Sequence, residues 1–285
     1  MGGDMPAPAG PGTASACIRR FGPRPAGRGR RTGHASLGEG RAAMIVAAAQ
    51  FSSVPGDVDG NARTMAGLVR EATGARVVVF AELALTGYEP ELIARDPGLR
   101  LADGDPRLDP VREACRESRA AAVVNTAAPG RRGGPRPALT SYVIGPDGAT
   151  LARYDKQHLH DAERGVFEAG TGDGRFTLDG HRFALATCFD NHFPELGGRA
   201  AADGCRVYLA SSLYGTGNGA LERAAVYPAL ARDHGLFVVL ANHVGPAGPW
   251  TGCGRSAVWG TDGTLLAEAD GVRPGVVRTR LPLAA

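Results

Sequence analysis

The chain has 285 residues, of which 43% are hydrophobic and 21% are charged, the composition of a globular protein that can bury a sizeable core. No stretch approaches the roughly 20 consecutive apolar residues of a membrane-spanning helix, so the composition predicts a soluble protein without a membrane partner. The five cysteines lie at wide, irregular spacings without a CxxC pair, which argues against a disulfide framework or a zinc knuckle and favours a reducing cytoplasm.

Residues 1–43 differ in composition from the rest of the chain. They contain ten glycines, five prolines and seven arginines but only two acidic residues, and they show no helical or strand periodicity. We therefore expect a disordered extension over residues 1–43, with Met44 as the functional start, followed by one domain over residues 44–285. The seven arginines and two acidic residues give the extension a net charge of +5, whereas the whole chain has +3. The remaining chain is therefore not basic, and no nucleic-acid partner is expected.

Alternating strand and helix patterns from Met44 onward predict an α/β protein with layered sheets. In the first half of this region, strands are expected at residues 45–51, 77–80 and 121–125, and helices near residues 59–72 and 109–118. The stretch over residues 129–137 is rich in Pro, Gly and Arg, which predicts a surface loop.

The second half repeats this rhythm, with strands expected at residues 181–187, 206–210 and 236–241 and helices after Pro194 and over residues 220–234. Three buried strands of the chain end in a polar side chain: Glu82, Cys188 and Asn242. Because ligands collect at the carboxyl ends of strands in layered α/β folds, we expect these three residues to share one pocket.

Two segments 115 residues apart resemble each other, residues 141–152 and residues 256–267. Each reads as a β-hairpin whose strands flank a Gly-x-Asp-Gly turn. The repeat predicts one domain with two pseudo-symmetric halves, each of which closes with a hairpin.

Cys188 and Glu82 are the strongest candidates for chemistry among the strand ends. Cys188 lies where a strand breaks into a turn, which presents a side chain beside converging backbone N–H groups, as an acyl-transfer nucleophile requires. Glu82 follows a buried strand, and burial raises a carboxyl pKa toward the value that suits a general base. Taken singly, the cysteine is also compatible with an inert core position and the glutamate with a salt bridge to an arginine.

Lys156 is the single lysine among the 32 Lys and Arg residues of the chain. A chain so biased toward arginine is expected to use it wherever any positive charge suffices. Lysine supplies a compact point charge, whereas the guanidinium group of arginine is a planar fork. We therefore expect Lys156 to hold the oxyanion that forms when a thiolate attacks a carbonyl, with a chance surface lysine as the alternative.

Three neighbourhoods together resemble the nitrilase, or carbon-nitrogen hydrolase, superfamily over residues 44–280. Phe80-Ala-Glu82 resembles its glutamate motif, Tyr154-Asp-Lys156-Gln-His-Leu its lysine motif, and Cys188-Phe-Asp-Asn-His-Phe-Pro-Glu195 its cysteine motif. The resemblance implies a four-layer-type α-β-β-α sandwich, an assembly into a homodimer or higher homo-oligomer, and Glu82, Lys156 and Cys188 as the catalytic residues.

The resemblance also implies substrate contacts. Glu163 falls where many members carry a second glutamate that helps position the substrate. Phe189, which follows the cysteine, and His192 are expected to border the substrate. The pair Asn191-His192 departs from the residues that many amidases of the family carry before Phe-Pro-Glu, so the substrate cannot be assigned by analogy. Three aromatic residues and one cysteine are further candidates for the wall of the pocket: Tyr88, Tyr214, Trp250 and Cys253.

The reaction implied is hydrolysis of a non-peptide C–N bond in a small amide or carbamoyl compound through a Cys thioester, without a cofactor. Nitrile hydrolysis by the same residues is an alternative, and so is a non-catalytic nitrilase-like binding protein. A third alternative is a dyad of Cys188 with His192, oriented by Asp190. His158 and His160 form an HxH pair, but no third ligand is evident, and no metal site is expected.

Overall fold

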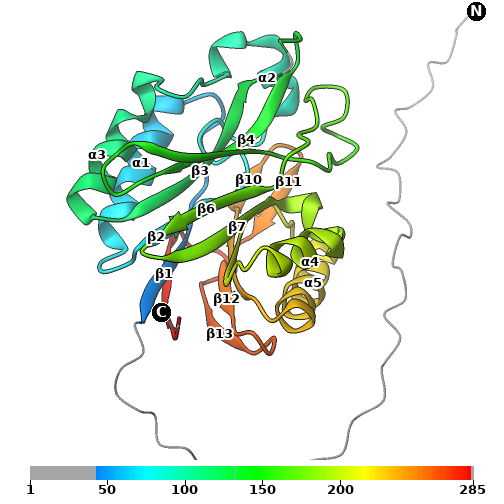
Figure 1. Ribbon diagram of the computed structural model, residues 1–285. Helices are drawn as coiled ribbons and strands as arrows, with labels where there is room; N and C mark the ends of the chain where they lie inside the picture. Colours follow the sequence, from blue (N-terminus) through cyan, green and yellow to red (C-terminus); the bar gives the residue numbers. More distant parts are fainter. Residues whose placement is uncertain (1–42, 132, 284–285) are drawn as a thin grey trace, which may run out of the picture. The chain divides into compact units, whose positions relative to one another are not determined.

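The computed structural model describes residues 43–131 and 133–283 (Figure 1). The expected disordered extension over residues 1–43 lies outside the described residues except for its last position, so it stays a prediction. The described chain folds into two six-stranded sheets with helices on their outer faces. No helix of the described part is long and apolar enough to cross a bilayer.

The first sheet has the strand order β14-β1-β2-β3-β4-β5. Its strands are β1 (Met44–Gln50), β2 (Val77–Val79), β3 (Ala121–Pro129), β4 (Pro137–Ile144), β5 (Thr150–Asp155) and β14 (Gly275–Leu281). The strands β1, β2 and β3 are parallel, the hairpin β4–β5 continues the sheet antiparallel to β3, and β14 pairs antiparallel with the other side of β1.

The second sheet repeats this plan, with the order β6-β7-β8-β9-β12-β13. Its strands are β6 (Gly174–Leu178), β7 (His181–Thr187), β8 (Val207–Ser212), β9 (Phe237–Asn242), β12 (Ala257–Trp259) and β13 (Leu265–Glu268). Again three parallel strands are flanked by an antiparallel hairpin on one side and by one antiparallel strand on the other. The prediction of two pseudo-symmetric halves, each with its closing hairpin, is confirmed.

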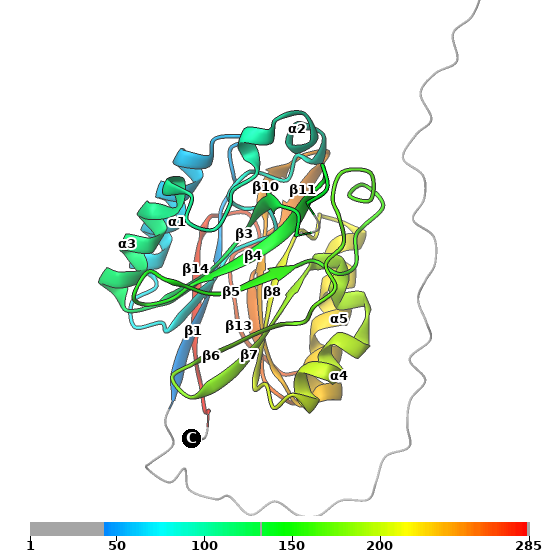
Figure 2. The same ribbon diagram turned by 45° about the horizontal axis from the view of Figure 1, so that its top comes forward.

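The helices complete an α-β-β-α sandwich, as predicted. The helices α1 (Val58–Glu71) and α3 (Asp109–Ser118) cover the outer face of the first sheet, whereas α4 (Pro194–Ala202) and α5 (Asn218–His234) cover that of the second (Figures 1 and 2). A short helix α2 (Pro90–Arg95) follows the loop after β2. Three one-turn 3-10 helices lie at Pro97–Leu99, Pro106–Leu108 and Cys188–His192.

Apolar side chains fill the spaces between these layers in separate clusters. Val46, Val77 and Val79 of the first sheet face Val207 and Leu209 of the second and form the core between the sheets. Alternate residues of the same strands point outward under the helices. Because both faces of the central strands are covered, these strands read as continuous apolar runs rather than as alternating patterns.

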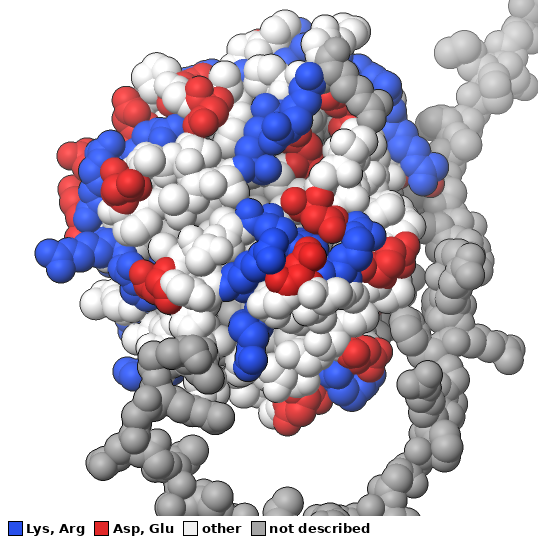
Figure 3. All heavy atoms as spheres, in the orientation of Figure 1, with Lys and Arg blue, Asp and Glu red and all other residues white. Residues whose placement is uncertain are grey.

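Of the strands that the sequence did not predict, β6 and β14 lie at the edges of the six-stranded sheets, and β10 (Val244–Ala247) and β11 (Trp250–Cys253) form a separate two-stranded sheet. The strands β6 and β14 alternate buried and exposed positions, and β14 exposes Arg278 and Arg280 partly or fully. The hairpin of β10 and β11 is short and rich in Gly and Pro. On the face drawn in Figure 3, acidic and basic side chains are interspersed.

Candidate active site

Glu82 lies in a tight turn directly after the second strand. The backbone N–H of Phe80 still donates to Val123 of β3, and the chain then turns away from the sheet. Leu83 adopts a left-handed backbone conformation, with φ of 48°, which side chains other than glycine rarely adopt. This turn keeps the Glu82 side chain fully buried, with 0% exposure.

Lys156 reaches the same place from the end of β5. Its backbone N–H donates to the carbonyl of Leu139, which continues the β4–β5 ladder by one position. Its ammonium Nζ lies 2.6 Å from Oε1 of Glu82 and 2.8 Å from each oxygen of Glu163. All three side chains are fully buried, so one ammonium bridges two carboxylates in the interior.

Burial and charge act in opposite directions on this cluster. Burial raises the pKa of Glu82 to about 8, because it outweighs the attraction of the Lys156 ammonium. Burial alone would lower the pKa of Lys156, but the carboxylates of Glu82 and Glu163 outweigh burial and raise it. The pKa of Glu163 is lowered, since Lys156 and the donors from Tyr88 and His160 exceed the effect of burial. Lys156 and Glu163 are therefore charged, and Glu82 is the group that exchanges a proton near neutral pH.

Cys188 begins the one-turn helix that follows β7, also with a left-handed backbone, φ 44°. Its Sγ lies 3.6 Å from the carbonyl oxygen of Leu213, and the residue is partly exposed. Burial of the sulfur and the nearby Glu82 carboxylate raise the pKa of the thiol well above its ordinary value. The thiol is thus neutral near pH 7.

One carboxyl oxygen of Glu82 is free to accept a hydrogen bond. Its Oε1 accepts from Lys156, whereas Oε2 has no hydrogen-bond partner among the described residues. The Cys188 thiol lies close enough to this carboxyl to stabilise its ionised form. The three residues predicted as catalytic therefore come together at one point from three different strands.

Glu163, predicted to contact substrate, lies behind Lys156. Its Oε1 accepts from the Tyr88 hydroxyl at 2.7 Å and its Oε2 from the backbone N–H of His160 at 2.9 Å, in addition to both bonds from Lys156. With every oxygen occupied, Glu163 fixes the position of the ammonium. Its contact with substrate stays a prediction.

Asp190 and His192 do not form a dyad with Cys188. Asp190 accepts from the Tyr154 hydroxyl at 2.7 Å and from the backbone N–H groups of Thr187 and His158, each at 2.9 Å. The His192 ring lies 3.3 Å from Glu222 instead, so the alternative in which Asp190 orients His192 is wrong. Asp190 holds the turn that carries the cysteine.

Phe189, which follows Cys188 in the sequence, belongs to a chain of aromatic contacts. Phe189 lies 5.0 Å from the His192 ring and 5.6 Å from the His160 ring, centroid to centroid. Trp250 of the β10–β11 hairpin lies 6.5 Å from His160 and 5.5 Å from Tyr88. We call these five rings the aromatic rim. That Phe189 and His192 contact the substrate stays a prediction.

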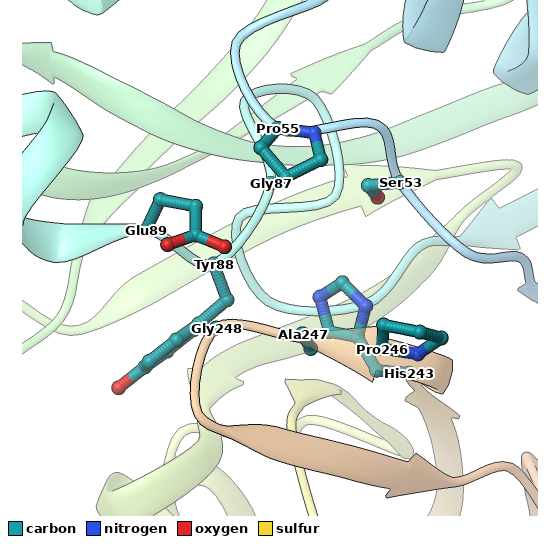
Figure 4. Close-up of a pocket in the computed structure, with 9 residues that line it drawn as sticks. All are labelled: Ser53, Pro55, Gly87, Tyr88, Glu89, His243, Pro246, Ala247 and Gly248. Atoms are coloured by element: carbon teal, nitrogen blue, oxygen red, sulfur yellow. The ribbon is translucent and has the colours of Figure 1, made fainter.

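Two cavities flank the site, and neither includes Cys188. One, of about 80 Å³, is lined on one side by Ser53 and Tyr88 and on the other by His243 (Figure 4). The other, of about 270 Å³, is lined by His158, Phe189 and Arg164 among others.

His158 stacks on Phe193 at 3.6 Å, and among the described residues no group of three His, Cys, Asp or Glu side chains could hold a metal ion.

Asn242 does not share the pocket, contrary to the prediction. Its side chain accepts from the backbone N–H of Tyr214 at 2.7 Å and donates to the carbonyl of Gly254 at 2.8 Å and to the Cys253 sulfur at 3.3 Å. The residue thus ties together loops of the second half. Cys253 lies against it rather than in the wall of the site.

Two buried polar residues beside the site were missed. Asn125, at the end of an apolar run in β3, accepts from the backbone N–H of Leu83 at 2.6 Å. His243, next to Asn242, lies with its Nε2 2.5 Å from the backbone oxygen of Glu82. A sequence signal existed for Asn125, because an apolar run ends there as one does before Glu82, although β3 itself continues to Pro129.

Comparisons with known proteins place the chain in a family. Residues 45–285 match the family model described as Carbon-nitrogen hydrolase. A protein named "Hydrolase in pqqF 5'region" from Pseudomonas protegens is 28% identical over 79% of this chain and 79% of its own length. An omega-amidase from Pongo abelii is 27% identical over 82% of this chain and 86% of its own. The solved structure of an amidase from Nesterenkonia sp. superposes with a TM-score of 0.76 at 28% identity, covering 84% of this chain and 90% of that one.

Proposed function

The chain belongs to the carbon-nitrogen hydrolase family, and we propose that it cleaves a small amide or carbamoyl compound through a thioester on Cys188. It is a hydrolase of C–N bonds other than peptide bonds, with amidases among its relatives. The observation that carries the proposal is the buried Lys156 ammonium 2.6 Å from Glu82, whose second oxygen is free beside the thiol.

Glu82 acts first as a general base. Its free Oε2 takes the proton from Cys188 while the sulfur forms a bond to the amide carbon, and the carbonyl electron pair moves to oxygen. A base with a pKa of about 8 is strong enough to accept this proton and weak enough to return it near neutral pH. Burial, which raises this pKa, therefore serves the reaction directly.

Lys156 and a backbone N–H stabilise the oxyanion of the tetrahedral intermediate. The N–H of Phe189 belongs to the first turn of the helix that Cys188 begins, where backbone donors have no partner within the helix. A well-aimed donor of this kind lowers the barrier by about 3–4 kcal/mol. Because Lys156 is held by two carboxylates, its charge is in place before the oxyanion forms.

The same groups complete the cycle. Glu82 gives its proton to the leaving nitrogen as the C–N bond breaks, and ammonia or an amine departs. Glu82 then takes a proton from water, whose oxygen attacks the thioester carbon. The C–S bond breaks, the acid product leaves, and the sulfur regains the proton from Glu82.

Arginine is a poor replacement for Lys156 in this mechanism. The site surrounds one nitrogen with Glu82 on one side and Glu163 on the other. A guanidinium presents its donors in a plane on a bulkier head, and it would displace one carboxylate from its position. This accounts for a single lysine in a chain that otherwise uses arginine.

The substrate lies, in our proposal, within the aromatic rim, against Phe189 and His192, with Glu163 behind the ammonium. Burial lowers the pKa of His192 despite the neighbouring Glu222, so the ring that borders the substrate is neutral. A neutral aromatic wall fits the acyl part of a small amide. The solved structures of the Nesterenkonia amidase include a variant in complex with butyramide, which supports a small acyl group.

Nitrile hydrolysis by the same residues and ligand binding without turnover are the competing functions. Both are tested by measuring ammonia release from a panel of ω-amides, N-carbamoyl amines, aliphatic amides and nitriles, with Cys188→Ala as the control. We expect release from at least one amide or carbamoyl class and none from the variant. Release from nitriles alone would favour the first competitor, and no release together with equal alkylation rates of Cys188 and Cys205 would favour the second.

Two further expectations concern the setting of the enzyme. We propose that the protein works in a reducing cytoplasm, supported by four free thiols among the described cysteines.

We also propose that the protein assembles into a homodimer or higher homo-oligomer, as the family resemblance implies. Light scattering of the purified protein measures the assembly, and a monomeric mass would contradict it.

A further inference from the structure

The peptide group between Glu82 and Leu83 is held from both sides. Its N–H donates to Oδ1 of Asn125 at 2.6 Å, and its carbonyl oxygen lies 2.5 Å from Nε2 of His243. Both ends of one peptide are thus bonded to buried side chains instead of to a neighbouring strand. Neither side chain is part of the mechanism described above.

The two side chains come from opposite halves of the protein. Asn125 belongs to β3 in the first sheet, whereas His243 follows β9 in the second. The Nδ2 of Asn125 also donates to Ser141 at 2.8 Å and to Thr187 at 3.3 Å. Since Thr187 directly precedes Cys188, one buried amide links the turn of the base to the strand of the nucleophile.

This peptide needs external support because of its backbone geometry. Leu83 has a φ of 48°, a conformation that costs free energy for a residue with a Cβ and persists only where the surroundings fix it. The two bonds hold the turn in place, and a shift of this turn would move the Glu82 Cα together with its side chain. Such a strained turn at a functional residue is a place where positioning matters.

His243 is suited to act as a fixed donor. Burial lowers the pKa of His243 to about 4, so the ring is neutral at working pH and donates from Nε2 to the Glu82 carbonyl. Its Nδ1 then carries a lone pair and has no partner among the described residues. The ring borders the cavity of about 80 Å³ beside Ser53 and Tyr88 (Figure 4).

We propose that Asn125 and His243 are positioning residues that clamp the Glu82–Leu83 peptide and thereby aim the Glu82 carboxylate between Lys156 and Cys188. The inference rests on the proposed role of Glu82 as general base. The clamp joins the two halves, so the base of the first half keeps its distance from the nucleophile of the second.

The test compares His243→Leu, which removes the donor, with His243→Gln, which keeps an N–H donor on a side chain of similar reach. Misplacing a catalytic group by about 1 Å costs roughly 10²-fold in rate. We therefore expect His243→Leu to lower kcat by about 10²-fold with little change in KM, and His243→Gln to recover most of the loss. Pro246→Ala, in the wall of the same cavity, is the matched control and should keep the activity of the unchanged enzyme.

The pH profile separates positioning from a loss of folded protein. The titratable groups that face the Glu82 carboxyl are Lys156, Glu163 and Cys188, with Tyr88 close behind. A loosened turn admits water and weakens the burial that raises the pKa of Glu82, so the acid limb of kcat/KM should move to lower pH in His243→Leu. If His243 had only a structural role, His243→Leu would lower kcat/KM at every pH and leave its acid limb at the same pH.

Asn125→Ala provides an independent check from the other side of the peptide. Because both residues hold one group, the double variant should lose less activity than the product of the two single losses. Equal impairment of His243→Leu and His243→Gln with an unmoved acid limb would overturn the proposal, as would full activity of His243→Leu. Full activity of Glu82→Gln would instead overturn the proposed function itself, so the two failures are distinguishable.

Discussion

Two ion pairs of this protein have nearly the same nitrogen–oxygen distance, and the pKa values of their carboxylates are shifted in opposite directions. Asp173 lies 2.7 Å from an Arg199 nitrogen at the surface, and Glu82 lies 2.6 Å from the Lys156 nitrogen in the interior. The hydrogen bond from Arg199 lowers the pKa of Asp173 to about 2. Burial raises the pKa of Glu82 to about 8 despite the nearby cation.

The difference shows that access to water, rather than distance, decides what an ion pair does. The side chains of Asp173 and Arg199 are 24% and 43% exposed, whereas those of Glu82 and Lys156 are 0% exposed. Water solvates the surface charges, so such a pair adds little stability. In the interior the carboxylate loses its hydration and competes with Glu163 for the same ammonium, which leaves a group ready to exchange a proton.

The strongest challenge to this comparison is to remove the acid in each pair. Glu82→Gln keeps the shape of the side chain but cannot accept a proton, and a general base contributes about 10²–10⁴-fold. We expect a loss toward the upper end of that range in kcat/KM, because Glu82 serves every proton transfer. Asp173→Asn is the control and should change kcat/KM by no more than about twofold. Comparable losses of kcat/KM in both variants would contradict the difference between the buried pair and the surface pair.

Exchanging the cation of each pair should give the next largest effect on activity. Lys156→Arg keeps the charge but replaces a single nitrogen with a fork, and loss of one oxyanion donor costs about 10²–10³-fold in kcat. The reverse exchange at the surface, Arg199→Lys, should be almost silent. Steady-state kinetics of both variants measure this, and an active Lys156→Arg enzyme would show that the site needs only a positive charge.

The pH dependence of kcat/KM in the unchanged enzyme tests the raised pKa of Glu82. Glu82 must be ionised to accept the thiol proton, and its ionised fraction rises about tenfold per pH unit below its pKa. With that pKa at about 8, kcat/KM should rise up to about pH 8 and then level off. An acid limb near pH 4.5, the ordinary value for a glutamate, would mean that the base is solvated or is a different residue.

The smallest expected effect is on stability. The pKa of Glu82 is raised on folding, so its protonated form favours the fold below pH 4.5, and this contribution is lost as the pH rises to about 8. Wild type should therefore lose free energy of unfolding between these values, and Glu82→Gln should lose less of it. For Asp173, whose pKa is lowered, the contribution is present above pH 3.8 and is lost as the pH falls to about 2. Denaturant titrations across the pH range measure both slopes, and parallel curves for Glu82→Gln and wild type would contradict the buried-carboxyl assignment.

Much of the site could be predicted from the sequence because its signals are local. Glu82 and Cys188 directly follow apolar runs that are buried on both sides, and Lys156 stands out as the single lysine. The closing hairpins also carry their own turn signature, which made the two halves visible. Each of these features needs only a few neighbouring residues to be recognised.

The contacts that aim these groups depend on pairings between distant parts of the chain. His243 and Glu82 are 161 positions apart, and no local pattern brings them together. The same reason explains the wrong expectation for Asn242, whose strand end faces loops of its own half. The edge strand β14 was missed because it forms only against β1, at the other end of the described chain.

In the proposed mechanism, Cys188 carries the acyl group of the substrate during turnover. Rapid acid quench of the enzyme during turnover of an amide, followed by peptide mass spectrometry, tests it directly. We expect an adduct with the mass of the acyl group on the Cys188 peptide, absent from Cys188→Ala. An acyl group on another residue, or ammonia release by Cys188→Ala at the rate of the unchanged enzyme, would contradict it.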